Sequence, residues 1–96
     1  MEPDSRSEHT LTELFEAEEW KAMSHVLGLT ARQREIARLI CRGDSRVRIA
    51  RTLGVTPDTV HAHTKEVFRK AGVSNRVKFV VRLVLLNRTN RKKPSG

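Results

Sequence analysis

Cysteine, tryptophan and tyrosine are the scarcest residues in this chain of 96 amino acids. Cys41 is the only cysteine, and there is no tyrosine. A single thiol excludes an internal disulfide and any zinc site built on cysteine pairs. Aromatic residues make up 4% of the chain, a composition that disfavours β-sandwiches and barrels. We expect Cys41 to be a buried or half-buried structural thiol.

Long hydrophobic runs and catalytic motifs are lacking as well. The longest apolar stretch, residues 79–86, is interrupted by Arg82, so the sequence predicts no membrane-spanning helix and no membrane partner. The acidic, polar start of the chain is unlike a signal peptide. Neither a glycine-rich phosphate loop nor a nucleophile–base constellation is present. The sequence therefore predicts a protein that is not an enzyme and that uses no cofactor or small-molecule ligand.

Charged residues are abundant and unevenly distributed. Residues 1–25 hold seven acids and two bases, a net charge of −5, whereas residues 26–96 hold four acids and seventeen bases, a net charge of +13. A strongly basic body predicts a polyanionic partner. We expect residues 1–9 to be an acidic disordered start and residues 88–96 a basic disordered tail. The acidic segment is a candidate inhibitor of polyanion binding.

Capping and stop signals divide the chain into helices and predict an all-α fold. A first amphipathic helix is expected at residues 10–28, with a Thr10–Glu13 capping box at its start and Trp20 as its anchor in the core. Four further helices are expected to begin after capping hydroxyl groups, at Thr30, Ser45, Thr56 and Ser74.

The two central helices fit a helix-turn-helix. A short helix ends at Gly54, and a second helix at residues 57–71 follows after a tight, glycine-containing connection. The inward stripe of the second helix is expected to consist of Val60, Thr64, Val67 and Ala71. The opposite face carries small or polar residues, so this helix can lie in the major groove of DNA, which is about 12 Å wide.

The last predicted helix, residues 75–87, has apolar residues on two faces. One set consists of Phe79, Val80, Leu83 and Leu86, and the other of Val77, Val81, Val84 and Leu85. The first set can cover the core of the domain, and the second then needs another surface. The same helix of a second protomer is the simplest source of such a surface, which predicts a homodimer. The alternative is that the acidic N-terminal helix covers the second set.

Residues 29–83 resemble the LuxR/NarL-type, or GerE-type, helix-turn-helix domain. The matching motifs, in order, are Leu29-Thr30-x-Arg32 with Glu35-Ile36, Gly43-x-Ser45, Ile49-Ala50-x-x-Leu53-Gly54-Val55, Thr59-Val60-x-x-His63, Lys70-x-Gly72-Val73 and Asn75-Arg76. The resemblance implies a four-helix domain at residues 29–86, preceded here by one extra helix, in a cytoplasmic, nucleoid-associated bacterial transcription regulator. In this family the third helix reads the major groove and the fourth pairs the protomers.

The resemblance and the physics of DNA recognition together assign candidate site residues. Base reading is expected from Asp58, His61, Ala62 and Lys65. Phosphate contacts are expected from Ser45, Arg46, Thr56, Thr59, Arg69 and Lys70. Dimerisation is expected from Val77, Val81, Val84 and Leu85. His61 and His63 point about 200° apart on a helix, so we expect no metal site there.

The sequence also departs from the family pattern. The family usually has Glu where Gln33 and Arg48 stand, and larger aliphatic residues where Thr64 and Ala71 stand. The two small residues predict free space in the core, to be filled by Phe68, Phe79 or Trp20. An alternative function is a protein-interaction module that resembles sigma-factor region 4 and contacts the transcription machinery, including RNA polymerase.

Overall fold

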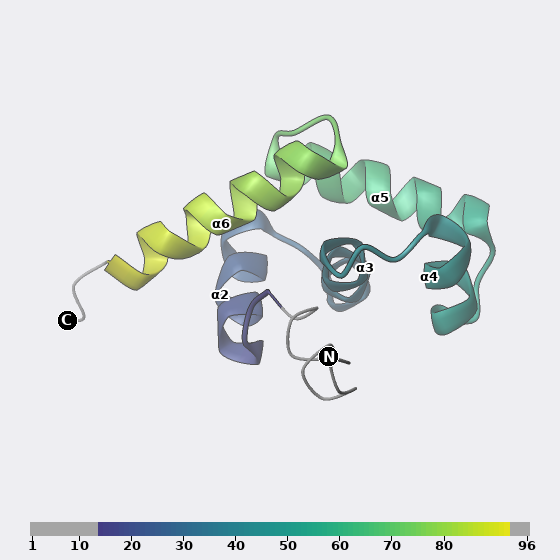
Figure 1. Ribbon diagram of the computed structural model, residues 1–96, viewed down its shortest axis with the longest axis horizontal. Coiled ribbons are helices and arrows are strands. Elements are labelled where there is room, and N and C mark those ends of the chain that lie inside the picture. Colours follow the sequence, from purple (N-terminus) through teal and green to yellow (C-terminus); the bar gives the residue numbers. More distant parts are fainter. Residues whose placement is uncertain (1–13, 93–96) are drawn as a thin grey trace, which may run out of the picture.

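The computed structural model describes the backbone of residues 14–92 and the side chains of residues 14–90. Within that range the chain forms five helices and no strand (Figure 1). They are α2 (Ala17–Leu27), α3 (Ala31–Cys41), α4 (Arg46–Leu53), α5 (Pro57–Ala71) and α6 (Arg76–Lys92). The all-α fold with one helix ahead of a four-helix domain is thus confirmed. None of these helices combines the length and the apolar character needed to cross a membrane.

Three of the predicted helix starts are confirmed by hydrogen bonds. The side-chain oxygens of Thr30, Ser45 and Thr56 accept from the backbone N–H groups three residues further along, at 3.1, 3.1 and 3.2 Å. These contacts satisfy donors that the first turn of a helix leaves unpaired. Each hydroxyl therefore fixes the residue at which the following helix begins.

Helix α2 begins later than the sequence predicts. The Thr10–Glu13 capping box lies outside the described residues. In the structure the chain bends at Phe15, and the helix starts at Ala17. The Glu16 N–H donates to Oε1 of Glu19 at 2.8 Å, so a carboxylate rather than a threonine hydroxyl group caps this end.

Helix α6 differs from its predicted bounds at both ends. Oδ1 of Asn75, not the Ser74 hydroxyl group, accepts from the Lys78 N–H at 2.8 Å. At the other end, α6 continues to Lys92, so residues 88–92 are helical although the sequence predicted a disordered tail there. Two features explain the extension. No glycine or proline occurs between Ser74 and Pro94, and basic residues favour the C-terminal end of a helix.

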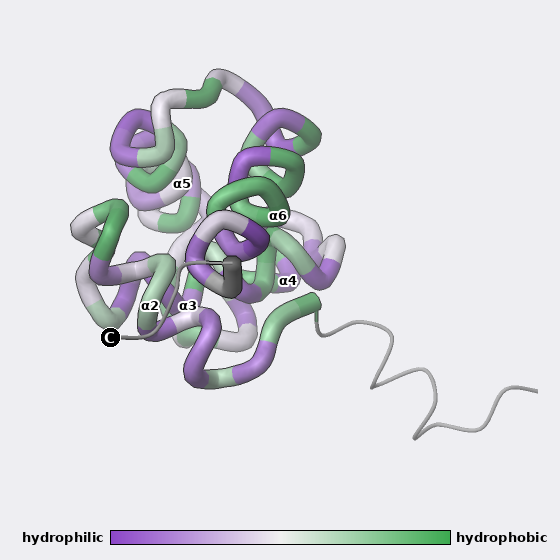
Figure 2. Tube along the Cα trace, turned by 90° about the vertical axis from the view of Figure 1, so that its left-hand side faces the viewer, coloured by the Kyte–Doolittle hydropathy of each residue, from purple (hydrophilic) through white to green (hydrophobic). Residues whose placement is uncertain are grey.

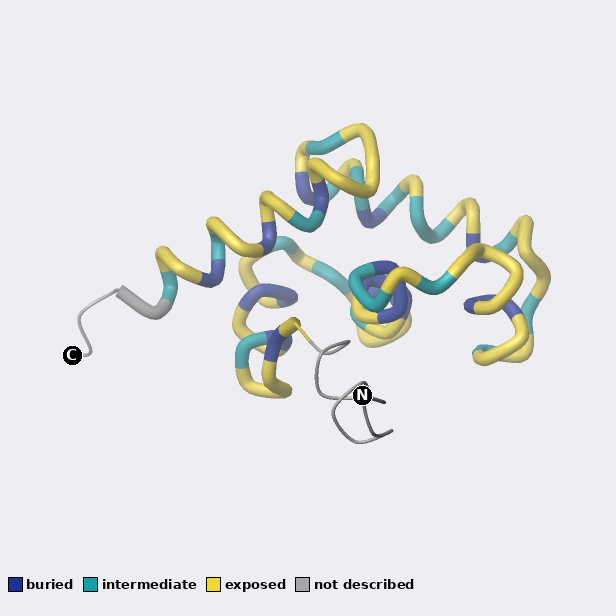
Figure 3. The backbone as a smooth tube through the Cα atoms, in the orientation of Figure 1, coloured by how far each residue is buried: buried dark blue, intermediate teal, exposed yellow. Residues whose placement is uncertain are grey.

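The core forms around α3, which lies in the middle of the fold between α2, α4 and α5 (Figures 1 and 3). Its fully buried members are Met23, Ile36, Ala37, Val67, Phe79 and Leu83. Trp20 is 4% exposed, which confirms its role as an anchor, and its ring meets that of Phe15 edge to face at 5.4 Å. Cys41 is half-buried, and burial raises the pKa of its thiol to about 12.

The space beside Thr64 is a hollow partly open to solvent rather than a cavity in the core. Thr64 is half-buried and lines a hollow of about 190 Å³ together with Phe68. The rings of Phe68 and Phe79 lie 5.1 Å apart, while Trp20 of α2 packs against Phe15, which precedes that helix. Phe68 thus borders the hollow beside Thr64, whereas neither Phe79 nor Trp20 lines it.

Candidate nucleic-acid interface

Helices α4 and α5 pack against each other and form the predicted helix-turn-helix. Ile49 and Ala50 of α4 and Val60 of α5 are buried at their junction. The turn is closed by a bond from the Val55 N–H to the Ala50 carbonyl oxygen at 3.0 Å. Gly54 has a φ of 70°, a left-handed conformation that glycine adopts without steric cost. The turn therefore holds the start of α5 beside the end of α4.

The inner and outer faces of α5 differ sharply. Val60, Val67 and Ala71 are buried, and Thr64 is half-buried, as the inward stripe predicts. The residues predicted to read bases are all exposed: Asp58, His61, Ala62 and Lys65. They lie together on the side of α5 that faces away from the core, so a groove of DNA could meet all of them at once.

Four of the residues predicted to contact phosphates lie at the starts of α4 and α5. Ser45 and Arg46 lie at the first turn of α4, and both are exposed. Thr56 and Thr59 lie at the first turn of α5, where their hydroxyl oxygens are 3.0 Å apart. A helix N-terminus presents unpaired N–H groups and a partial positive charge, which together attract an anion.

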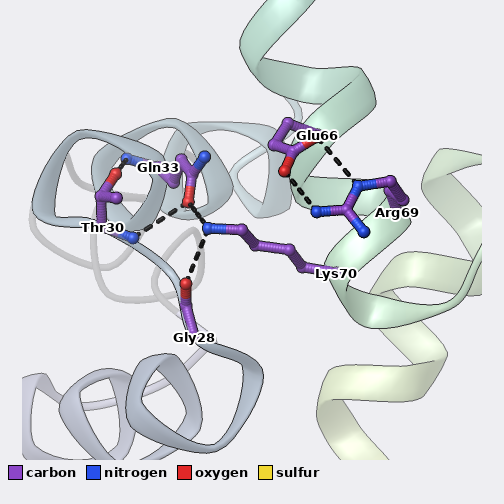
Figure 4. A network of polar contacts seen from close by, with 6 residues as sticks. All are labelled: Gly28, Thr30, Gln33, Glu66, Arg69 and Lys70. Atoms are coloured by element: carbon purple, nitrogen blue, oxygen red, sulfur yellow. Dashed lines mark hydrogen bonds and ion pairs between the residues drawn. The ribbon is translucent and has the colours of Figure 1, made fainter.

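Arg69 already has an anionic partner within its own helix. Its Nε donates to Oε1 of Glu66 at 3.0 Å, and its Nη2 bonds the second carboxylate oxygen (Figure 4). The hydrogen bond from Arg69 and the charges nearby hold the pKa of the Glu66 carboxyl below its ordinary value. Arg69 therefore has to share its guanidinium group, or release Glu66, in order to contact a phosphate.

Lys70 makes internal contacts that the sequence analysis missed. Its Nζ donates to the Gly28 carbonyl oxygen and to Oε1 of Gln33, both at 2.7 Å (Figure 4). The same Gln33 oxygen accepts from the Thr30 N–H at 3.0 Å. Lys70 thus ties the end of α5 to the start of α3. An ammonium group has three donors, so one remains for another partner.

Arg76 is a second missed tether. Its Nη2 donates at 2.7 Å to the carbonyl oxygen of Asp44, in the turn before α4. The sequence offered this residue only as part of a family motif, because a contact across 32 positions leaves no local signal. Arg76 also lines the hollow beside Thr64, together with Arg46 and His61. Three side chains that can carry positive charge therefore meet next to the start of α4.

The four candidate dimerisation residues lie on the outer face of α6. Val77 is 72% exposed, Val81 and Leu85 are both 51% exposed, and Val84 is 38% exposed. Helix α2 packs against α6, where Nδ2 of the buried Asn87 donates to Oε2 of Glu19 at 2.9 Å. The alternative that α2 covers the second apolar set is therefore wrong. Figure 2 shows hydrophobic segments recurring along α6.

The two histidines of α5 have different surroundings. His61 is exposed, whereas His63 is half-buried. Across the described residues, no three His, Cys, Asp or Glu side chains gather closely enough to hold a metal ion.

Comparisons with known proteins agree with this geometry. Residues 27–83 match the family described as bacterial regulatory proteins, luxR family. The chain is 40% identical over 60 residues to the probable transcriptional regulatory protein SgaR of Hyphomicrobium methylovorum, covering 62% of this chain and 28% of that protein. It is 40% identical over 55 residues to the transcriptional regulatory protein UhpA of Escherichia coli, covering 57% and 28%.

A third relative is the putative HTH-type transcriptional regulator YhjB of Escherichia coli, 35% identical over 63 residues that cover 66% of this chain and 32% of that protein. The chain thus spans less than a third of the length of these relatives. No solved structure matches the chain. The family match covers more than half of the residues and confirms the resemblance. The chain therefore belongs to the LuxR family of bacterial regulatory proteins.

Proposed function

We propose that the protein binds specific DNA sequences as a homodimer, with α5 in the major groove. The observation that carries this proposal is the outer face of α5. Asp58, His61, Ala62 and Lys65 are exposed there, while the inner face of the same helix is held in the core. A helix whose inner face is packed in the core and whose outer face is polar can present its outer side chains to base edges in a set register.

Each outer residue has a base that suits its chemistry. The Lys65 ammonium can donate to guanine O6 or N7, and the Ala62 methyl group can contact the methyl group of thymine. The Asp58 carboxylate can accept from cytosine N4, and it also favours the N-terminus of α5 electrostatically. His61 can donate or accept, depending on its protonation.

Phosphate contacts supply most of the affinity in this proposal. Ser45 and Arg46 at the start of α4, and Thr56 and Thr59 at the start of α5, face the backbone on either side of the groove. Arg69 contributes when it is released from Glu66, and Lys70 contributes through its remaining donor. These contacts set the position of α5 on the duplex without reading its sequence.

The dimer follows from the exposed apolar stripe on α6. A two-fold axis would bring Val77, Val81, Val84 and Leu85 of each protomer against the same residues of the other. Two recognition helices would then reach two half-sites spaced about one helical turn of DNA apart, roughly 34 Å. The operator is accordingly expected to be pseudo-palindromic.

Selection of binding sites from random duplex DNA tests the function. The selected sequence is expected to contain two inverted half-sites, and its affinity to fall about 10³-fold between 50 and 200 mM salt if about six phosphates are contacted. Failure to enrich any sequence, together with binding to RNA polymerase, would favour the protein-interaction module instead. Enrichment of a single half-site would support sequence-specific DNA binding and contradict the homodimer.

A further inference from the structure

A partly open pocket of about 300 Å³ lies between α2 and α3, and the DNA-binding proposal does not use it. One wall is aromatic, formed by Phe15 and Trp20. Lys21, Arg34 and Arg38 also line the pocket. Among the described residues, none from α5 contributes to it. DNA bound on the outer face of α5 therefore leaves this pocket unfilled.

No acidic side chain from the described residues pairs with the positive side chains of this pocket. Lys21, Arg34 and Arg38 make no ion pair within the described part of the chain. Glu35 also lines the pocket, but its carboxylate pairs with Arg32, with nitrogen and oxygen 3.5 Å apart. An apolar wall beside unpaired positive charges suits an occupant that is acidic and carries an apolar side chain.

The chain itself contains such an occupant. Residues 1–13 carry four acids and one base, and Leu11 is the one branched aliphatic residue among them. Leu11 precedes Phe15 by four positions, so its Cα can lie at most about 14 Å from that of Phe15. Glu8 and Glu13 stand on either side of it.

Tethering favours this segment over a free ligand. The segment joins the described chain at Leu14, directly before the aromatic wall. A short tether gives an effective concentration of about millimolar, whereas a free molecule loses translational freedom when it binds. The pocket also lies at the lower end of the size range of ligand sites, roughly 300–1,000 Å³.

We propose that residues 1–13 fold back into the pocket between α2 and α3. Leu11 contacts the Phe15–Trp20 wall, and the carboxylates of Glu8 and Glu13 neutralise Arg34, Arg38 and Lys21. The acidic segment is thereby held away from the outer face of α5, and its charge lowers the positive potential of the domain without covering the DNA-binding residues.

A spin label on the segment tests this placement in the full-length chain. A nitroxide is attached to the Ser7→Cys variant; burial raises the pKa of the Cys41 thiol to about 12, which directs the reagent to the new cysteine. Amide and side-chain signals of Arg34 and Arg38 are expected to broaden strongly at about 0.01 M ionic strength and weakly at about 1 M, where the screening length falls from about 30 to 3 Å.

Matched variants separate the pocket from general charge attraction. Removing two ion pairs in Arg34→Gln/Arg38→Gln is expected to lower the ratio of docked to undocked chains about 2- to 30-fold, since an exposed pair is worth a factor of about 1.4–5. Arg48→Gln/Arg51→Gln removes the same charge from exposed positions of α4 and should leave the broadening unchanged. Leu11→Ser should reduce it, and Thr12→Ser should not.

Two results would overturn the proposal. Equal broadening in both arginine double variants would show that the segment follows net charge rather than the pocket. Broadening centred on His61, Ala62 and Lys65 would place the acidic segment on the recognition helix instead, as a direct competitor of DNA.

Discussion

Helices α5 and α6 have similar inner faces and contrasting outer faces. Each buries a stripe of apolar residues in the same core, with Val67 of α5 and Phe79 of α6 fully enclosed. Outside, α5 exposes Lys65 and other polar or small residues, whereas α6 exposes valines such as Val81.

The inner face of each helix sets its place in the fold, whereas the outer face is the surface that it offers to a partner. A polar outer face with a free ammonium group matches base edges and phosphates, which offer acceptors. An apolar outer face gains nothing from DNA and is stabilised only when another apolar surface removes it from water. Substitutions on the inner and outer faces of both helices test this contrast.

A substitution on the inner face of α6 is expected to have the largest effect, a loss of folding stability. Phe79→Ala removes a fully buried ring that contacts Phe68, and it should lower the free energy of unfolding by about 3–5 kcal/mol. Val77→Ala on the outer face, where the side chain is 72% exposed, should change it by less than about 0.5 kcal/mol. Urea unfolding curves measure both, and similar losses in the two variants would contradict the assignment of faces.

The outer face of α5 comes second. Lys65→Ala should weaken binding to the selected operator by about 1–3 kcal/mol and relax the preference at a single base pair. Arg69→Ala is the control, because a phosphate contact should weaken binding to all sequences alike. Fluorescence anisotropy with operator and point-substituted duplexes separates the two; a uniform loss for Lys65→Ala would move this residue from base reading to phosphate binding.

The inner face of α5 holds the hollow beside Thr64. Thr64→Leu is expected to raise the free energy of unfolding by about 0.5–2 kcal/mol, since leucine fills space and is a better helix former. Thr89→Leu is the matched control: both hydroxyl groups bond the carbonyl oxygen four residues earlier, at 2.8 and 3.0 Å, but Thr89 is exposed. Equal gains in the two variants would assign the effect to helix propensity alone.

The outer face of α6 should affect folding least. Val81→Glu is expected to change the free energy of unfolding by less than about 0.5 kcal/mol, while sedimentation shows the loss of dimers. Lys78→Glu, an exposed position outside the apolar stripe, should leave association intact. A wild-type chain that sediments as a monomer at high concentration would show that pairing is absent or requires DNA.

Local sequence signals predicted a helix start correctly where a capping residue was followed by an apolar pattern that is buried in the core. Thr30, Ser45 and Thr56 each combine a capping hydroxyl group with an apolar pattern behind it, and each cap forms. The two ends of α6 were predicted less well. Ser74 and Asn75 are both good caps, so the sequence could not choose between them. Residues 88–92 are all polar and have no apolar spacing that would predict a helix.

Tertiary contacts explain the residues that sequence analysis missed or assigned incompletely. Lys70 reads as an exposed cation at the end of α5, yet it bonds Gly28 and Gln33 on another element. Arg76 reads as a helix-start residue, yet it holds the turn at Asp44. Both contacts join residues more than 30 positions apart, so the local sequence around Lys70 or Arg76 does not predict its partner.

The helical fold, the helix-turn-helix and the family could be predicted from the sequence, because they follow from caps, apolar spacing and ordered motifs within short stretches of chain. Two other features became visible only in three dimensions: α2 leaves the valine stripe of α6 exposed, and a pocket lined by arginines opens beside Trp20. Whether a side chain is covered depends on which elements meet in space, and in this chain those elements are far apart in sequence.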